Sequence, residues 1–156
     1  MSIDITKLPV SELMPHKPPM LLIDRIIDWG DEYLTAEVCI DSNSMFLDEN
    51  NNVPAWVGIE YMAQTVAAFA GVRAYNEGAP IPVGFLLGTR KYLSKVDHFK
   101  NGEKLVVKIQ SVYEDEAGLG SFDCEICTDN VLASARINTF KPKNDKLQDF
   151  LESSNQ

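Results

Sequence analysis

The sequence predicts an α+β fold in which an antiparallel sheet wraps around one long helix. The helix is expected at residues 55–75, AWVGIEYMAQTVAAFAGVRAY, which is the longest apolar stretch with helical character. Two strand-like stretches joined by a turn precede it, and only strand signals follow it. A helix that is apolar on nearly every side cannot lie on a surface. We therefore expect the sheet to cover most of it and a partner subunit to cover the remaining face.

The segments before the helix are expected to form a short N-terminal element and a hairpin. Prolines at 15, 18 and 19 end the first element and keep the next residues extended. The Trp29-Gly30-Asp31 triplet is typical of a turn between two strands. The expected bounds are 1–14 for the N-terminal element, 20–27 and 33–40 for the two strands, and 41–53 for a long polar loop.

The segments after the helix carry strand signals only. Pro54 suits the first turn of the helix, and the Glu-Gly-Ala-Pro sequence at 77–80 ends it. Asn101-Gly102 and Asp129-Asn130 are typical hairpin turns. The expected strands are 83–87 and 91–96 on either side of Gly88-Thr89-Arg90, then 104–113, 121–128 and 131–140, followed by a polar tail at 143–156, all within one domain at 1–156.

Composition excludes several classes of function. The 156 residues include 14 Lys and Arg against 23 Asp and Glu, a formal net charge of −9. Binding of nucleic acid or anionic lipid needs clustered basic charge, so neither is expected. There is no apolar run of roughly 18 residues to span a membrane and no secretion signal, so we expect a cytoplasmic protein with reduced cysteines. Cys124 and Cys127 lack a second pair of ligands, so no metal site is expected.

Glu60 is the first candidate for chemistry. It is the only charged residue between Ala55 and Val72, in the middle of an apolar helix. Burial of an unpaired carboxylate is costly, and perturbed carboxylates gather at active sites, where they suit general acid–base catalysis. The alternative is that Glu60 lies on a thin solvated edge of the helix. Gln64, four residues on, is placed to hydrogen-bond to it.

A second titrating group is needed, and the chain has two histidines. His16 lies in PHKPPM, a segment stiffened by prolines, whereas His98 lies just before a turn. A single histidine in a loop is more often surface decoration than a catalyst. Stiff flanks favour His16 because catalysis needs a fixed position.

Three stretches of the chain resemble the FabZ-type 3-hydroxyacyl-acyl-carrier-protein dehydratases. LMPHKPPMLLIDRI is similar to the opening of that family, and IEYMAQ to its central-helix motif. GFLLGTRKYLSKV followed by NGEKLVVKI is similar to its next strand pair. The similarity spans roughly residues 8–140, with the three stretches in order and at fitting spacing. Within the family, the sequence most resembles the FabZ-like, ApeP-like dehydratases of aryl-polyene biosynthesis.

The resemblance implies a hotdog fold, assembled as a dimer with active sites at the subunit interface. It implies dehydration of (3R)-3-hydroxyacyl thioesters on acyl carrier protein to trans-2-enoyl thioesters, in fatty-acid-like or polyene biosynthesis. No metal or cofactor is implied, because the phosphopantetheine arm belongs to the carrier. Glu60 matches the catalytic carboxylate that protonates the leaving hydroxyl. Candidate substrate-binding residues are Ala55, whose backbone N–H would hold the thioester carbonyl, together with Gln64 and Trp56.

The chain departs from that family at one position. Counting back from Pro54 places Phe46 where the family has the His of a His-Phe-Pro motif. One hypothesis is that His16 reaches the same pocket and acts as the base. The other is that the chain is a non-catalytic or half-catalytic subunit that pairs with a second hotdog dehydratase. The partner is then either a second copy, in a homodimer, or a different chain, in a heterodimer.

Two further alternatives stay open. Hotdog proteins include acyl thioesterases, in which a helix carboxylate activates water, and fold alone does not decide between the reactions. The stretches PHKPPMLLIDRI and IEYMAQ favour a dehydratase. Arg90, Lys91, Lys95 and Lys100 form the one locally basic stretch. It is either a docking surface for an acidic carrier protein or an ordinary solvated strand face.

Overall fold

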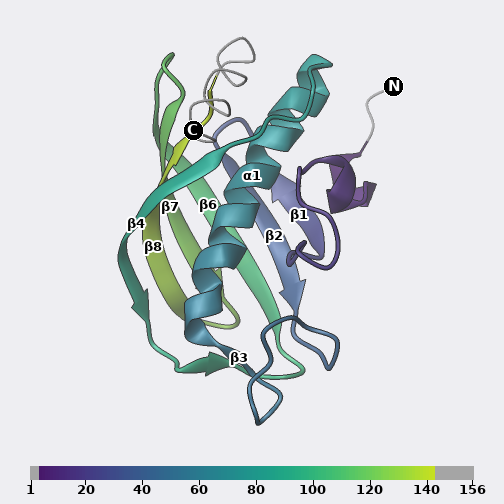
Figure 1. Ribbon diagram of the computed structural model, residues 1–156, viewed down its shortest axis with the longest axis vertical. Helices are drawn as coiled ribbons and strands as arrows, with labels where there is room; N and C mark the ends of the chain where they lie inside the picture. Colours follow the sequence, from purple (N-terminus) through teal and green to yellow (C-terminus); the bar gives the residue numbers. More distant parts are fainter. Residues whose placement is uncertain (1–3, 143–156) are drawn as a thin grey trace, which may run out of the picture.

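The computed structural model describes residues 4–142, and the polar tail expected at 143–156 lies outside the described residues. Six strands form one sheet in the order β1-β2-β6-β7-β8-β4, curved around a single long helix (Figure 1). Every neighbouring pair in the sheet is antiparallel, which confirms the predicted α+β class. The strands are β1 (Arg25–Trp29), β2 (Tyr33–Cys39), β4 (Phe85–Ser94), β6 (Lys104–Glu114), β7 (Leu119–Cys127) and β8 (Val131–Phe140).

The helix forms where the apolar stretch predicts it. A 3₁₀ turn, η3 (Ala55–Val57), leads directly into α1 (Gly58–Glu77). Gly78 ends the helix with φ of 67°, in the left-handed region that glycine adopts without a steric penalty. None of the helices in the described part of the chain is long and apolar enough to cross a membrane.

The core lies between α1 and the concave face of the sheet. The helix packs against β2, β6, β7 and β8. Alternate residues of each strand face the helix because strand side chains alternate between the two faces. The buried side chains on the strands include Leu34, Ala36, Val38, Leu105, Val107 and Ile109, and those on the helix include Tyr61, Met62, Ala68, Phe69 and Val72.

The N-terminal segment differs from the expected strand at 20–27. Two 3₁₀ turns, η1 (Ile5–Lys7) and η2 (Val10–Glu12), form the N-terminal element. Strand β1 begins only at Arg25. The residues before it form a turn at 18 and 19 rather than the expected extended chain, and the N–H of Leu22 donates to the Gln64 side chain of α1 at 2.7 Å. Among the described residues before β1, only the N–H of Asp24 already bonds to β2, at the oxygen of Glu37.

The expected strands 83–87 and 91–96 are one strand, β4. The pairing of β4 with β8 shifts register between Leu86 and Gly88 and again between Arg90 and Leu93. These irregularities accommodate the Gly88-Thr89-Arg90 sequence, so that the strand continues through it. The structure also contains a pairing that the sequence did not predict: β3 (Val53–Pro54) pairs with β5 (His98–Phe99) below the start of α1.

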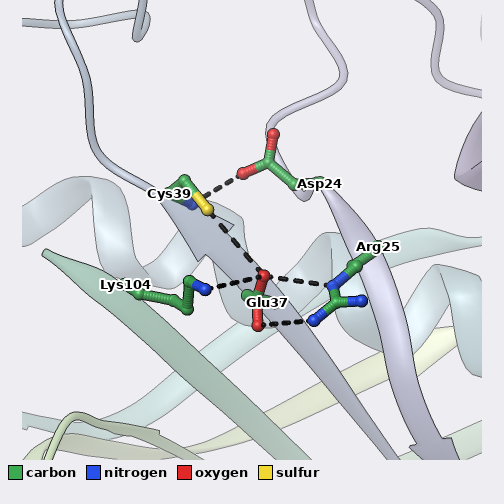
Figure 2. A network of polar contacts seen from close by, with 5 residues as sticks. All are labelled: Asp24, Arg25, Glu37, Cys39 and Lys104. Atoms are coloured by element: carbon green, nitrogen blue, oxygen red, sulfur yellow. Dashed lines mark hydrogen bonds and ion pairs between the residues drawn. The ribbon is translucent and has the colours of Figure 1, made fainter. Parts of the chain in front are cut away.

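The opposite face of β2 carries a buried carboxylate, Glu37, whose side chain points away from the helix (Figure 2). Its Oε1 lies 3.1 Å from Nε of Arg25 on β1 and 4.0 Å from Nζ of Lys104 on β6. Its Oε2 accepts from Nη2 of Arg25 at 3.3 Å. Two cations, one from each neighbouring strand, therefore balance the charge of Glu37.

Candidate active site

A cavity of about 660 Å³ runs along α1 and contains both leading candidate residues. Glu60 and His16 line it together, although they come from segments 44 residues apart in the sequence. The remaining walls are formed by α1, by the start of β4 and by the adjoining ends of β7 and β8. The assignment of His16 and Glu60 as a catalytic pair stays a prediction, for which a shared cavity is a necessary condition.

Glu60 lies in the first turn of α1, half-buried, with its side chain at the cavity. Its Oε1 accepts a hydrogen bond from Nε2 of Gln64 at 3.1 Å, the contact expected for residues four apart on a helix. Within residues 4–142, Oε2 makes no hydrogen bond and neither oxygen makes an ion pair. One carboxylate oxygen is thus available to a bound ligand.

Gln64 connects the helix to the N-terminal segment. The residue is 1% exposed, and its Nε2 donates to the backbone oxygen of Met20 at 2.7 Å as well as to Glu60. Its Oε1 accepts from the N–H of Leu22 at 2.7 Å. The side-chain amide of Gln64 therefore bonds only to protein groups in these three contacts, and it links Glu60 to the N-terminal segment. Gln64 is not among the described residues that line the cavity, so the geometry favours a positioning role over direct contact with substrate.

His16 is held at the cavity by the same segment. Three residues before His16, the backbone of Leu13 lies directly against Gly71 of α1, where a Cβ would lie 1.6 Å from the Leu13 oxygen. The Nδ1 atom of His16 is buried and has no hydrogen-bond partner within the described residues. Buried polar atoms are normally satisfied, so an unpartnered imidazole nitrogen at a cavity wall is suited to a ligand or a water molecule.

The other residues singled out in the sequence lie away from this cavity. His98 pairs with Pro54 in the short β3–β5 ladder. The backbone N–H of Ala55 donates to the oxygen of Asp97 at 3.0 Å, so it is not free for a thioester carbonyl as expected. Trp56 is 61% exposed and packs edge-on against Phe46, with ring centroids 5.7 Å apart. None of these residues belongs to the described lining of the cavity.

All three cysteines lie on strands, and Cys124 and Cys127 are buried whereas Cys39 is partly exposed. Cys124 and Cys127 are 1% and 7% exposed, and all three cysteines are free thiols. Burial raises the pKa of Cys124 to about 12, which keeps its thiol protonated and unreactive. Within residues 4–142, no group of three His, Cys, Asp or Glu side chains is arranged to hold a metal ion.

The basic stretch after the helix lies on the surface. Arg90, Lys91, Lys95 and Lys100 are all exposed, the first two on β4 and the others on the chain that follows it. Leu86, Leu87 and Leu93 of the same strand are 46%, 58% and 66% exposed. Strand β4 is an edge of the sheet, and it therefore presents both apolar and basic side chains to solvent.

Comparison with known proteins agrees with this architecture. Residues 8–152 match the ApeP-like family, described as ApeP dehydratase. The chain is similar to a 3-hydroxyacyl-[acyl-carrier-protein] dehydratase FabZ from Acinetobacter baylyi, with 25% identity over 86% of this chain and 90% of that protein. A FabZ from Vibrio vulnificus is 28% identical over 72% of this chain and 77% of its own length. The chain spans 24% of the length of a bifunctional LpxC/FabZ enzyme from Porphyromonas gingivalis, with 27% identity.

Two solved structures show the fold. A chain of the dehydratase heterocomplex ApeI:P from Xenorhabdus doucetiae superposes with a TM-score of 0.85 and 31% identity, over 92% of this chain and 97% of that one. A hypothetical thioesterase from Streptococcus pneumoniae, solved with coenzyme A, gives a TM-score of 0.59 at 14% identity, over 74% of this chain and 86% of that one. The predicted hotdog fold is confirmed, and the chain belongs to the ApeP-like dehydratase family.

Proposed function

We propose that the chain dehydrates (3R)-3-hydroxyacyl thioesters carried on acyl carrier protein, giving trans-2-enoyl thioesters. The observation that supports this proposal is that Glu60 and His16 both line one cavity within a single chain. General acid–base catalysis needs an acid and a base in fixed positions. The helix fixes the position of Glu60, and the neighbouring prolines restrict the segment of His16. Membership of a dehydratase family supports the same reaction.

In the proposed reaction, the two side chains exchange two protons with the substrate. His16 removes a proton from C2, and the electrons of that C–H bond form the C2–C3 double bond. The C3–O bond breaks at the same time, and its oxygen takes a proton from Glu60, so that water leaves. Atoms and charge balance without a cofactor or an oxidant, and the phosphopantetheine arm belongs to the carrier. Gln64 positions both groups, because it bonds to Glu60 and to the backbone of the segment that carries His16.

A second role is supported by the heteromeric relative. The chain of the ApeI:P heterocomplex is 31% identical to this one. In this role, the chain pairs with a second hotdog dehydratase that supplies part of the catalytic machinery, while Phe46 replaces the usual histidine. The exposed leucines of β4 and the exposed Trp56 suit burial against another subunit. The basic residues beside them suit an acidic carrier protein, whose affinity would then fall with added salt.

Analysis of the product tests the reaction. The purified chain, alone and after co-expression with a second hotdog dehydratase, is incubated with a 3-hydroxyacyl thioester on carrier protein, and mass spectrometry follows the acyl group. Loss of one water, giving an enoyl thioester, is expected. Release of free thiol would instead identify a thioesterase. Activity of the chain alone would exclude a purely structural role, whereas activity only in the mixture would establish the subunit role.

The two histidines provide a matched pair of variants. His16→Asn is expected to lower kcat/KM at least about 100-fold, the usual contribution of a general base. His98→Asn is the control, since it changes the same residue type outside the cavity. Both variants should unfold at the same temperature as the wild type. Full activity of His16→Asn would remove His16 from the mechanism.

A further inference from the structure

The cavity has two ends of different chemistry. Of the α1 residues that line it, Glu60 is the first and Arg73 the last, and Glu114 lines it beside Arg73. The 13 residues from Glu60 to Arg73 correspond to about 20 Å along the helix axis. The cavity is therefore elongated, with the candidate acid Glu60 at one end.

The walls between these ends are mostly apolar. Three alanines of α1 (Ala63, Ala67 and Ala70) line one side, and their short side chains leave space beside the helix. Leu86 and Phe122 line the cavity from β4 and β7. An apolar chain that begins at Glu60 would run along these walls toward Arg73, and each methylene would gain by leaving water.

The lining at the far end includes an ion pair, and its contacts join three elements. Nη1 of Arg73 lies 2.7 Å from Oε1 and 2.8 Å from Oε2 of Glu114, at the end of β6. Nη2 of Arg73 donates to the backbone oxygen of Asp31, in the turn between β1 and β2, at 2.8 Å. In Figure 1 the β6–β7 hairpin and the C-terminal end of α1 lie at the same end of the molecule.

Both members of the pair have additional support. The guanidinium of Arg73 lies over the ring of Phe69, 4.2 Å from its centroid. The hydroxyl of Ser111 donates to Oε2 of Glu114 at 3.0 Å. Isolated surface ion pairs are loosely held, whereas these contacts fix the positions of both charges. The pair is a defined end wall of the cavity.

We propose that the Arg73–Glu114 pair sets the upper limit of acyl chain length. Each side chain is 36% exposed, so the pair keeps part of its hydration. An apolar chain end that reached it would displace that water and leave the charges poorly solvated, which is unfavourable. Chains that stop short of the pair gain affinity with each methylene, and longer chains do not. The inference rests on the proposed function because it takes the thioester to lie at Glu60.

Binding of saturated acyl-pantetheine thioesters tests the limit without chemistry, since these molecules lack the 3-hydroxyl group. Affinity of the full chain is measured by calorimetry for a series from butanoyl to hexadecanoyl. In the wild type, affinity should rise with length and then level off. The double variant Arg73→Met with Glu114→Gln removes both charges while keeping the side-chain stems. It should raise the ratio of hexadecanoyl to octanoyl affinity about tenfold, as expected for additional buried methylenes.

Two further variants make the test specific. Arg73→Ala with Glu114→Ala opens the same end and should shift the profile in the same direction. Arg136→Met with Asp123→Asn is the matched control: that pair also joins an arginine and a carboxylate, at 2.9 Å, but lies on β7 and β8 outside the described lining of the cavity. Its length profile should equal that of the wild type. Circular dichroism and the melting temperature show that each variant is folded.

Length profiles of both Arg73–Glu114 variants that coincide with the wild-type profile would overturn the inference. An equal shift in the Arg136 control would also overturn it, as would failure of any saturated thioester to bind. Failure of the proposed function would give a different result. Binding would still show the length limit, but neither the chain nor its complex would dehydrate the corresponding 3-hydroxyacyl thioester.

Discussion

Glu37 and Glu60 are both carboxylates that are partly or wholly shielded from solvent, but their neighbours differ. Glu37 is 7% exposed and contacts two cations, Arg25 and Lys104 (Figure 2). Glu60 is half-buried, and its only hydrogen-bond partner within residues 4–142 is the neutral amide of Gln64. Glu37 lies on the outer side of the sheet, whereas Glu60 lies at a cavity shared with a histidine.

The difference is the one expected between a structural carboxylate and a catalytic one. Both oxygens of Glu37 are engaged by neighbouring side chains, so the group contributes to holding β1, β2 and β6 together. Glu60 leaves one oxygen free and faces open space. A buried carboxylate without a cation is costly to stability, and proteins keep such groups mainly where a reaction uses them. Removal of the charge at Glu60 should therefore affect mainly activity, and removal of the charge at Glu37 mainly stability.

The largest effect is expected for Glu60→Gln. The amide keeps the size of the side chain but cannot give a proton to the leaving hydroxyl, so kcat/KM should fall by about 100- to 10,000-fold. The free energy of unfolding should change by less than about 0.5 kcal/mol, since no ion pair is lost. Dehydration kinetics and urea unfolding of the same preparation check both values. If Glu60→Gln kept activity within a few-fold of the wild type, Glu60 would be a structural carboxylate like Glu37.

Substitution of Gln64 should affect both properties. Gln64→Leu leaves the backbone oxygen of Met20 and the N–H of Leu22 without their partners, at a cost of about 2 kcal/mol in unfolding free energy. It also removes the anchor that Glu60 shares with the His16 segment, so we expect about a tenfold loss in kcat with a smaller change in KM. Gln110→Leu, at an exposed position of β6, is the control. Loss of stability without loss of kcat would contradict the positioning role.

Glu37→Gln should lower stability and leave activity unchanged. Arg25 and Lys104 are 58% and 63% exposed, so water solvates them once the carboxylate is gone, and the expected cost is about 1 kcal/mol. A double-mutant cycle with Arg25→Met measures the pair directly, and added salt should reduce the coupling. A loss of dehydration as large as that of Glu60→Gln would remove the distinction between the two carboxylates.

The sequence predicted the helix and strands whose formation depends on residues close together in the chain. The central helix and its end at Gly78 followed from an apolar stretch and a single glycine, and strands β2, β6, β7 and β8 lie close to their expected bounds. Glu60 was found because it is the one charge in that stretch. Glu37 was missed because its burial depends on Arg25, which is brought beside it only by strand pairing.

Features that depend on distant contacts could not be predicted in the same way. Strand β1 starts later than expected because Leu22 bonds to Gln64, 42 residues away. The β3–β5 ladder has two residue pairs, too few to leave a periodic pattern. Ala55 has the expected place at the helix start, but its N–H is taken by Asp97 from a segment 42 residues further on. The close packing of Leu13, three residues before His16, against α1 depends on Gly71, and this role is visible only in the packed structure.

Asp24 offers the smallest and most discriminating test, because it is the second carboxylate in the network of Figure 2 and makes no ion pair within residues 4–142. Its Oδ2 accepts from the N–H of Cys39 at 2.6 Å. Partial burial raises its pKa above the ordinary 3.8, and the nearby charges of Asp41 and Glu37 add to the effect, while the Cys39 hydrogen bond opposes it.

A raised pKa in the folded state means that ionisation of Asp24 costs stability as the pH rises from below 3.8 through the folded-state pKa. Asp24→Asn keeps an acceptor for Cys39 and removes this cost. Because water screens the group, the gain at neutral pH should be less than about 0.5 kcal/mol, and it should vanish below the unfolded pKa. Urea unfolding across this pH range measures it, with the exposed turn residue in Asp129→Asn as control. Destabilisation at neutral pH would show that the charged hydrogen bond to Cys39 outweighs burial, so that Asp24 belongs with Glu37 among the structural carboxylates.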